Sequence, residues 1–152
     1  MQDVIDSVER EIVIAAPIER VWELITVPEH VQAWYAFDGA KLALRPRGLI
    51  EHFWKEHGRY RGVVEEVKPP TLLSYWYSNV PDADPEPGRQ THVAIRLEST
   101  SQGDATVVRV TESGLASLEI SPEERRAYLA ATADGWEGGL TALKEHAAGV
   151  TT

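Results

Sequence analysis

Residues 121–148, with the sequence SPEERRAYLAATADGWEGGLTALKEHAA, indicate which kind of fold the rest of the chain forms. The serine, proline and two glutamates at the start are typical of a helix N-terminus, and Gly149 stands where a helix can end. The apolar residues recur every three or four positions and predict one continuous stripe, formed by Leu129, Ala133, Trp136, Leu140, Leu143 and Ala147. At about 1.5 Å per residue the helix is roughly 40 Å long, so the stripe needs a broad surface to pack on.

We expect a sheet to supply that surface, because much of the remaining chain alternates apolar and polar residues. The alternation predicts strands over residues 8–14, 41–44, 49–56, 60–67, 72–78, 91–98 and 105–112. Residues 18–25 have apolar side chains at helical spacing, and a second short helix begins at Pro28. Short turns between successive strands favour antiparallel pairing. The predicted fold class is α+β: a curved antiparallel sheet of about six to seven strands around a long C-terminal helix, with two short helices after the first strand.

Composition excludes several classes of function. The 152 residues carry a formal net charge of −9, which argues against nucleic acid and anionic membranes as main partners. The chain contains no cysteine, so disulfides, thiol catalysis and cysteine-ligated metals are excluded. No apolar run approaches the length of a membrane span, so no membrane insertion is expected, and the acidic N-terminal residues do not resemble a secretory signal. We expect one cytoplasmic domain over residues 1–152.

Several short motifs follow one another along nearly the whole chain. They are EIVIAAPIERVW at residues 11–22, PEH at 28–30 ahead of Trp34, LRPRG at 44–48, VKPP at 67–70, TESG at 111–114 and Gly135-Trp136. Together they resemble the START/Bet v 1-like (SRPBCC) superfamily, and more narrowly the bacterial single-domain relatives of the C-terminal domain of the Hsp90 ATPase activator. The resemblance implies a helix-grip fold with a ligand cavity between sheet and helix, and the superfamily includes polyketide cyclases. Arg47 stands where the family often has a second glycine, which leaves the geometry of that turn open.

Aromatic side chains are the strongest indication of a binding site. By strand and helix parity, the rings predicted to face the interior are Trp54, Tyr75, Tyr77 and Trp136, and those near its mouth are Trp34, Tyr35 and Phe37. Aromatic rings with polar tips suit a mainly apolar pocket, although plain core packing is the alternative and is favoured for Trp136. Tyr128 and Thr132 lie beside the helical stripe and are placed to line the same cavity. The glycines within residues 135–139 either let the helix approach the sheet or leave space for a ligand.

Two polar residues are the weak catalytic candidates. Glu112 shares the inward parity of Val108 and Val110, and a carboxylate facing the interior is costly unless it is paired. It would anchor a ligand or act as a general base with a raised pKa, unless it lies at a frayed strand end and reaches water. His52, inward on its own strand, is its candidate partner. Because His52 and His57 point to opposite faces of a strand, and no catalytic or dinucleotide motif occurs, no metal, cofactor or defined catalysis is predicted.

Three functions remain open. The first is binding of a small, largely apolar or aromatic molecule between the sheet and the helix. The second is a polyketide cyclase-like or other pocket enzyme, with acid and base supplied by His52, Glu112 and Tyr77. The third is protein interaction through an outer surface near Trp76 or the acidic loop at residues 82–87, and the outward Trp76 would also suit a homodimer. Because the eukaryotic co-chaperone engages Hsp90 with an additional N-terminal domain, a chaperone partner is not expected.

Overall fold

The computed structural model describes residues 6–149, so the ends of the predicted domain, 1–5 and 150–152, lie outside the described residues. The strands are β1 (Val8–Ile14), β2 (Gly39–Leu42), β3 (Leu49–Trp54), β4 (Gly58–Lys68), β5 (Leu72–Ser78), β6 (Gln90–Ser99) and β7 (Thr106–Ser113). The helices are α1 (Ile18–Thr26), α2 (Pro28–Trp34), the short 3-10 helix η1 (Leu115–Ser117) and α3 (Pro122–Gly149).

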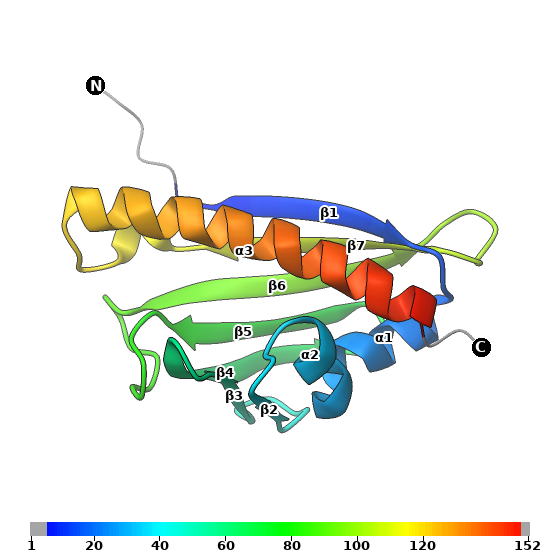
Figure 1. Cartoon of the computed structure of the whole chain (residues 1–152), viewed down its shortest axis with the longest axis horizontal. Helices are drawn as coiled ribbons and strands as arrows, with labels where there is room; N and C mark the ends of the chain where they lie inside the picture. Colours follow the sequence, from blue (N-terminus) through cyan, green and yellow to red (C-terminus); the bar gives the residue numbers. More distant parts are fainter. Residues whose placement is uncertain (1–5, 150–152) are drawn as a thin grey trace.

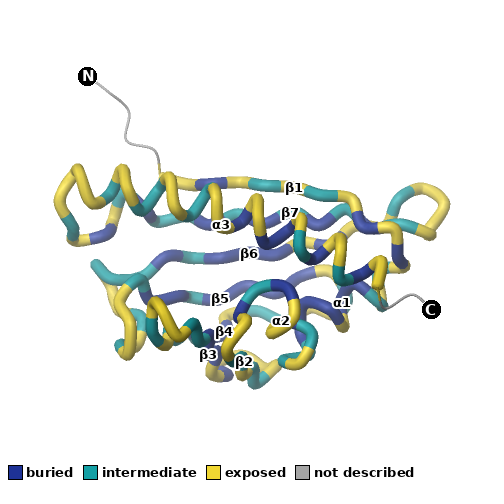
Figure 2. Tube along the Cα trace, in the orientation of Figure 1, coloured by how far each residue is buried: buried dark blue, intermediate teal, exposed yellow. Residues whose placement is uncertain are grey.

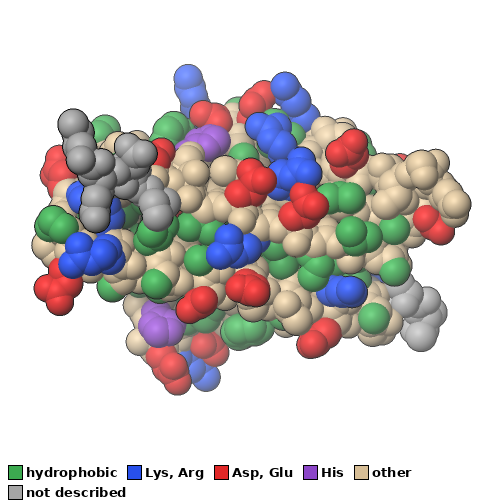
Figure 3. Space-filling model, turned by 90° about the horizontal axis from the view of Figure 1, so that it is seen from above, with side chains coloured by type: hydrophobic (Ala, Val, Ile, Leu, Met, Phe, Trp, Pro, Cys, Tyr) green, Lys and Arg blue, Asp and Glu red, His purple; other side chains and the backbone are tan. Residues whose placement is uncertain are grey.

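The strands form one antiparallel sheet, and α3 crosses one face of it diagonally (Figure 1). The strand order is β1-β7-β6-β5-β4-β3-β2, so successive strands pair from β2 to β7 and β1 closes the far edge beside β7. The predicted α+β helix-grip fold is therefore confirmed, with seven strands and two short helices after the first. Acidic and basic side chains are interspersed over the face seen in Figure 3.

The start of α3 is fixed by the capping residues that the sequence contains. The Ser121 Oγ accepts a hydrogen bond from the Glu124 backbone N–H at 3.0 Å, and the Glu124 carboxylate accepts one from the Ser121 N–H at 3.1 Å. This reciprocal pair satisfies two N–H groups that a helix N-terminus otherwise leaves unpaired.

The turn at residues 43–48 keeps the geometry of a glycine-containing turn although Arg47 occupies one of its positions. Arg47 has φ of 68°, in the left-handed region that favours glycine. Gly48 is required next to it, because a Cβ there would lie 1.9 Å from the Ala43 carbonyl oxygen. Strand β3 begins directly afterwards with its register to β4 intact.

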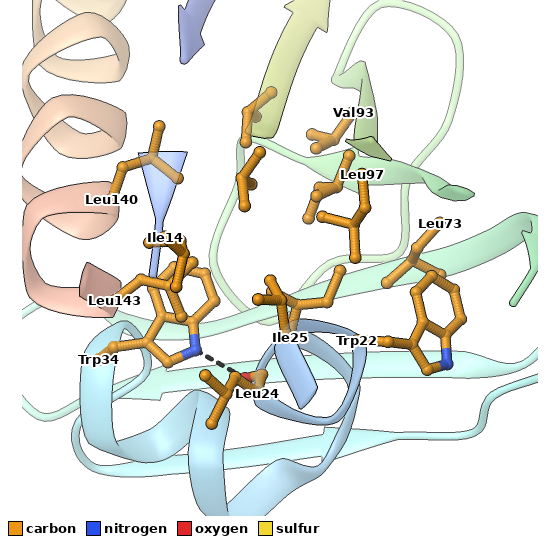
Figure 4. Packing of buried hydrophobic residues seen from close by; sticks show 14 of the residues in the cluster. Ile14, Trp22, Leu24, Ile25, Trp34, Leu73, Val93, Leu97, Leu140 and Leu143 are labelled. Carbon is orange, nitrogen blue, oxygen red and sulfur yellow. Dashed lines mark hydrogen bonds between the residues drawn. The ribbon is translucent and has the colours of Figure 1, made fainter. Parts of the chain in front are cut away.

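The predicted apolar stripe of α3 is buried over only part of its length, so the expectation that a broad surface covers the whole stripe is corrected. Trp136, Leu140, Leu143 and Ala147 are buried, whereas Leu129 and Ala133 are only half-buried (Figure 2). The cause is the placement of α1 and α2, which lie beside the C-terminal half of α3 (Figure 1). Their apolar side chains complete a core there with Leu140 and Leu143, including Leu24, Ile25 and Trp34 (Figure 4).

The outer face of the sheet carries the predicted outward tryptophan. Trp76 lies opposite His92 in the register of β5 and β6, with ring centroids 4.8 Å apart. The His92 ring is in turn hydrogen-bonded to the Glu65 carboxylate at 2.7 Å. Among the described residues, no helix is long and apolar enough to cross a membrane.

Candidate functional site

A groove opens beneath the middle of α3, with a volume of about 790 Å³. It is bounded by the α2–β2 loop, by the turn between β3 and β4, and by α3 itself. Its lining residues are Trp34, Tyr35, Phe37, Asp38, Trp54, Lys55, Glu56, His57, Tyr60, Asp134, Gly135, Gly138 and Gly139. Pockets for drug-sized ligands typically measure about 300–1,000 Å³, so the groove is large enough for such a molecule.

A smaller hollow of about 190 Å³ adjoins the groove under the N-terminal half of α3, and we call it the recess. The groove and the recess share the lining residues Tyr35, Trp54, Tyr60 and Gly135. The rest of the recess is lined by Tyr77, Glu112, Tyr128, Ala131, Thr132 and Trp136. Because the recess lies where the stripe of α3 is only half-buried, the incomplete packing of this helix creates the space.

The glycines of α3 have separate roles. A Cβ added at Gly135 or Gly138 would meet no atom within 4 Å, so these two positions leave space open. A Cβ at Gly139 would lie 3.2 Å from the Tyr35 ring, so this glycine permits close packing between helix and ring. The close approach predicted from the sequence therefore occurs at Gly139, but toward the end of α2 and not toward the sheet.

Aromatic rings form a mutually packed wall between the groove and the recess. The Tyr35 ring stacks on Trp136 with centroids 5.1 Å apart and meets Trp54 edge-on at 5.3 Å. The Trp54 Nε1 donates a hydrogen bond to the Tyr35 carbonyl oxygen at 2.9 Å. Tyr60 stacks on Tyr77 with centroids 6.3 Å apart. Since each ring is held by another, the wall is formed before any ligand arrives.

Glu112 lies in the recess with a buried side chain, as its parity predicted, and the alternative of a frayed strand end is wrong. The residue is only 5% exposed. One carboxylate oxygen accepts a hydrogen bond from Thr91 Oγ1 at 2.7 Å, and the other accepts one from Trp136 Nε1 at 2.8 Å. Burial raises the pKa of Glu112, and the two hydrogen bonds oppose that rise without cancelling it.

His52 is not the partner of Glu112, which corrects the predicted pairing. Its strand β3 is separated from β7 by β4, β5 and β6. The buried His52 ring instead forms a hydrogen bond between Nδ1 and the Tyr77 hydroxyl at 2.9 Å. Burial lowers the pKa of His52 to about 4, so the imidazole is neutral at neutral pH. His52 does not line the recess itself, but its ring contacts three residues that do: Tyr77 through the hydrogen bond, and Tyr35 and Trp54 edge-on.

The structure divides the remaining predicted site residues into two groups. Phe37, Trp54, Tyr77, Tyr128, Thr132 and Trp136 line the groove or the recess. Tyr75 and His52 instead line a void of about 30 Å³ between α2 and the sheet, a space near the size of one water. Trp34 was expected near the mouth but is a buried core residue at the base of the groove, and its Nε1 donates to the Leu24 carbonyl oxygen (Figure 4).

Tyr60 is the aromatic side chain of the groove and the recess that sequence reasoning missed. It lies opposite His52 in the register of β3 and β4, and it shares the parity of the buried Val64. Alternation along residues 60–67 could therefore have identified it. Within residues 6–149, no group of three or more histidine, aspartate or glutamate side chains could hold a metal ion.

The architecture is of the helix-grip class, which is a ligand-binding fold. Residues 15–148 match the family model described as Activator of Hsp90 ATPase homolog 1-like protein. Because the match covers most of the chain, the protein belongs to that family. No curated protein matches the sequence significantly.

Solved structures support the same fold. The protein MLL2253 from Mesorhizobium loti is similar with a TM-score of 0.77 and 22% identity, over 96% of this chain and 99% of that one. The Aha1 dimer from Colwellia psychrerythraea has a TM-score of 0.72 and 19% identity, over 93% and 95% of the two chains. DynU16, described as a putative protein in the dynemicin biosynthetic locus, has a TM-score of 0.74 and 20% identity, over 94% of this chain and 47% of its own. At these identities the likeness concerns the fold alone.

Proposed function

We propose that the protein binds a small, largely apolar molecule in the groove and the recess, without a defined reaction. The observation that carries the proposal is the open space of about 790 Å³ that leads to an aromatic recess under α3. Between α2 and the sheet the interior is filled more closely, with a void of only about 30 Å³. The groove and the recess are lined by several aromatic rings, which suit an aromatic or aliphatic ligand.

Phe37 provides a direct test of this proposal. It is 58% exposed and lines the groove, so its ring contributes little to the core. We expect Phe37→Ala to leave the melting temperature nearly unchanged and to weaken binding of the best compound from a screen of fatty acids, sterols, flavonoids and aromatic polyketides. In the native protein, a compound at about one hundred times its Kd should add about 2.7 kcal/mol. That corresponds to a rise of about 5–10 °C in melting temperature, which a thermal-shift assay detects readily.

Leu49 offers a matched control for Phe37. It is an apolar side chain that is exposed to a similar degree but does not line the groove. Leu49→Ala should therefore leave ligand affinity unchanged. A screen without any stabilising compound, or equal losses of affinity in the two variants, would count against the groove as the binding site.

A pocket enzyme is the second candidate, and the buried carboxyl of Glu112 is the observation that favours it. A carboxyl whose pKa is raised by burial is a suitable general base or acid near neutral pH. Tyr77 lines the same recess, and His52 contacts it through a hydrogen bond. The candidate requires that Glu112 change its protonation within the working pH range.

The direction in which Glu112 changes the stability of the protein with pH can be predicted. Its pKa in the folded protein is raised above the ordinary value of 4.5, so the stability that Glu112 contributes is fully present below that value and is lost as the pH rises through the folded pKa. Glu112→Gln should therefore gain melting temperature relative to the native protein as the pH rises above 4.5. Carboxyl NMR of the native protein should show the raised pKa directly.

Glu65 serves as a comparison, because its pKa is shifted in the opposite direction from that of Glu112. The hydrogen bond with His92 lowers the pKa of Glu65, so its contribution is present above the ordinary value of 4.5 and is lost as the pH falls through the folded pKa. Glu65→Gln should lose melting temperature relative to the native protein as the pH rises. A Glu112 carboxyl that titrates at or below its ordinary pKa would leave the enzymatic candidate without a base.

Self-association through the outer face of the sheet is compatible with ligand binding. The Aha1 relative from Colwellia psychrerythraea is described as a dimer. In this chain the half-buried Trp76 meets the His92 ring edge-on on the face opposite the groove, so a second copy there would leave the groove open. Nothing in residues 6–149 singles out a surface for a chaperone, and no chaperone partner is proposed.

A further inference from the structure

The described residues include two buried carboxylates, and their surroundings differ in one respect. Glu51 is 8% exposed and Glu112 is 5% exposed. The carboxylate of Glu51 lies within 4 Å of three cationic groups: Lys41 Nζ at 3.6 Å, Arg59 at 3.8 Å and Arg61 at 3.9 Å. Within residues 6–149, Glu112 has no cationic partner, and its two hydrogen bonds come from the neutral donors Thr91 and Trp136.

A buried carboxylate without a counter-ion is costly, because neutral donors replace only part of its lost hydration. The carboxylate of Glu112 retains unused acceptor capacity, since its two oxygens offer about four lone-pair sites and two hydrogen bonds are formed. Glu112 is also one of the residues that line the recess. The unused acceptors are therefore available to a group that enters this space.

The surroundings of Glu112 in the recess are aromatic. The recess lining contains six aromatic side chains and, within the described part of the chain, no lysine, arginine or histidine. Burial raises the pKa of Tyr35, Tyr77 and Tyr128, and the negative charge of Glu112 adds to the rise, so these rings lie within its electrostatic reach. Ring faces attract cations, and the attraction is strongest where water is excluded.

We infer that the ligand of the groove carries a protonated amine, which enters the recess, binds the carboxylate of Glu112 and is surrounded by the aromatic rings. The inference rests on the proposed function, since it specifies the chemistry of the molecule that the groove would hold. An ammonium group pairs the carboxylate that lacks a counter-ion and meets the ring faces at the same time. A carboxylate ligand would meet like charge there, and a neutral alcohol would leave the charge unpaired. The net charge of −9 also favours the approach of a cation.

The test compares three probes that share one aromatic skeleton: 2-naphthylmethylamine, 2-naphthalenemethanol and 2-naphthoic acid. Calorimetric titration at pH 7 should give the amine an affinity at least about tenfold higher than that of the alcohol, with the acid weakest. In Glu112→Gln the affinity of the amine should fall to that of the alcohol, while the affinity of the alcohol stays unchanged. Glu51→Gln, the matched change at the other buried carboxylate, should keep the full preference for the amine.

A second variant keeps the test decisive if Glu112→Gln does not fold. Thr132 is half-buried, lines the recess and lies in the less tightly packed half of α3. Thr132→Lys would place a tethered ammonium in the recess and should weaken binding of the amine at least about tenfold by competition and repulsion. Ala130→Lys, an exposed position on the same helix outside the lining, should not weaken it.

The outcomes separate the two proposals. If the alcohol or the acid binds as tightly as the amine, or if the preference survives both Glu112→Gln and Thr132→Lys, the inference about the amine is overturned and the groove remains a binding site. If all three probes and the whole apolar screen fail to bind, the proposed function is overturned and the inference with it.

Discussion

Replacing Gly135 by leucine is expected to stabilise the protein and to abolish ligand binding at the same time. Gly135 lies in the middle of α3 and lines both the groove and the recess. A Cβ at this position would meet no atom within 4 Å, so a leucine side chain would occupy the open space without displacing the core. Leucine is a better helix former than glycine by about 0.8 kcal/mol, which corresponds to a rise of about 2 °C in melting temperature.

The loss of binding in Gly135→Leu should be large, because Gly135 lines both the groove and the recess and the added side chain takes up ligand space there. We expect the affinity for the tightest compound of the screen to fall by at least about one hundredfold, or about 2.7 kcal/mol. Melting curves with and without that compound measure both effects on one sample. Ala130→Leu is the control: it adds the same side chain to an exposed position of α3 and should leave affinity unchanged.

Stability and binding would change in opposite directions in Gly135→Leu, which makes the result hard to explain by damage to the fold. A variant that is more stable and still binds would show that the ligand lies elsewhere. A variant that is less stable would show that Gly135 permits a close approach of backbone or ligand that the free space around its Cβ does not reveal.

The fold could be predicted from the sequence because its signals are local. The alternation in residues 72–78 and the capping residues Ser121 and Glu124 each specify structure over a few positions, and the structure has β5 and the start of α3 there. The buried length of α3 could not be predicted in the same way. Periodicity identifies which face of a helix is apolar, but the helices α1 and α2 decide which part of that face is covered.

The candidate site shows the same limit. Parity placed Glu112 inside, since a strand's alternation fixes the face of each side chain. Its pairing with His52 was wrong, because parity does not state how many strands lie between two residues. Tyr75 and Tyr77 have the same parity on one strand, yet Tyr75 lines only the small interior void and Tyr77 lines the recess. The position of each tyrosine along β5 relative to α3 decides which space its ring lines. That position is fixed only when the whole fold has assembled.

The two halves of α3 therefore have separate functions in this structure. The C-terminal half is held by the sheet on one side and by α1 and α2 beside it, and it closes the core. The N-terminal half spans the recess, with the small or polar residues Ala131, Thr132 and Gly135 turned toward the space. Stability and ligand binding should accordingly respond to substitutions in different halves of the same helix.

Leu143→Ala should be the most destabilising of the substitutions considered, because Leu143 is fully buried in the C-terminal half of α3. Truncating a buried leucine costs about 3 kcal/mol or more, through lost burial and the cavity left behind. Leucine and alanine are both good helix formers, so packing and not helix propensity dominates the change. The melting temperature should fall by about 6–12 °C.

The matched substitution Leu129→Ala should cost about 1 kcal/mol or less, since Leu129 is only half-buried in the N-terminal half of the helix. Chemical denaturation of both variants measures the two free energies of unfolding on one scale. If Leu143→Ala lowers the free energy of unfolding clearly more than Leu129→Ala does, the core packs tightly only against the C-terminal half of α3. Equal costs would mean that the N-terminal half packs as tightly in solution, and the recess beneath it would then be closed to a ligand.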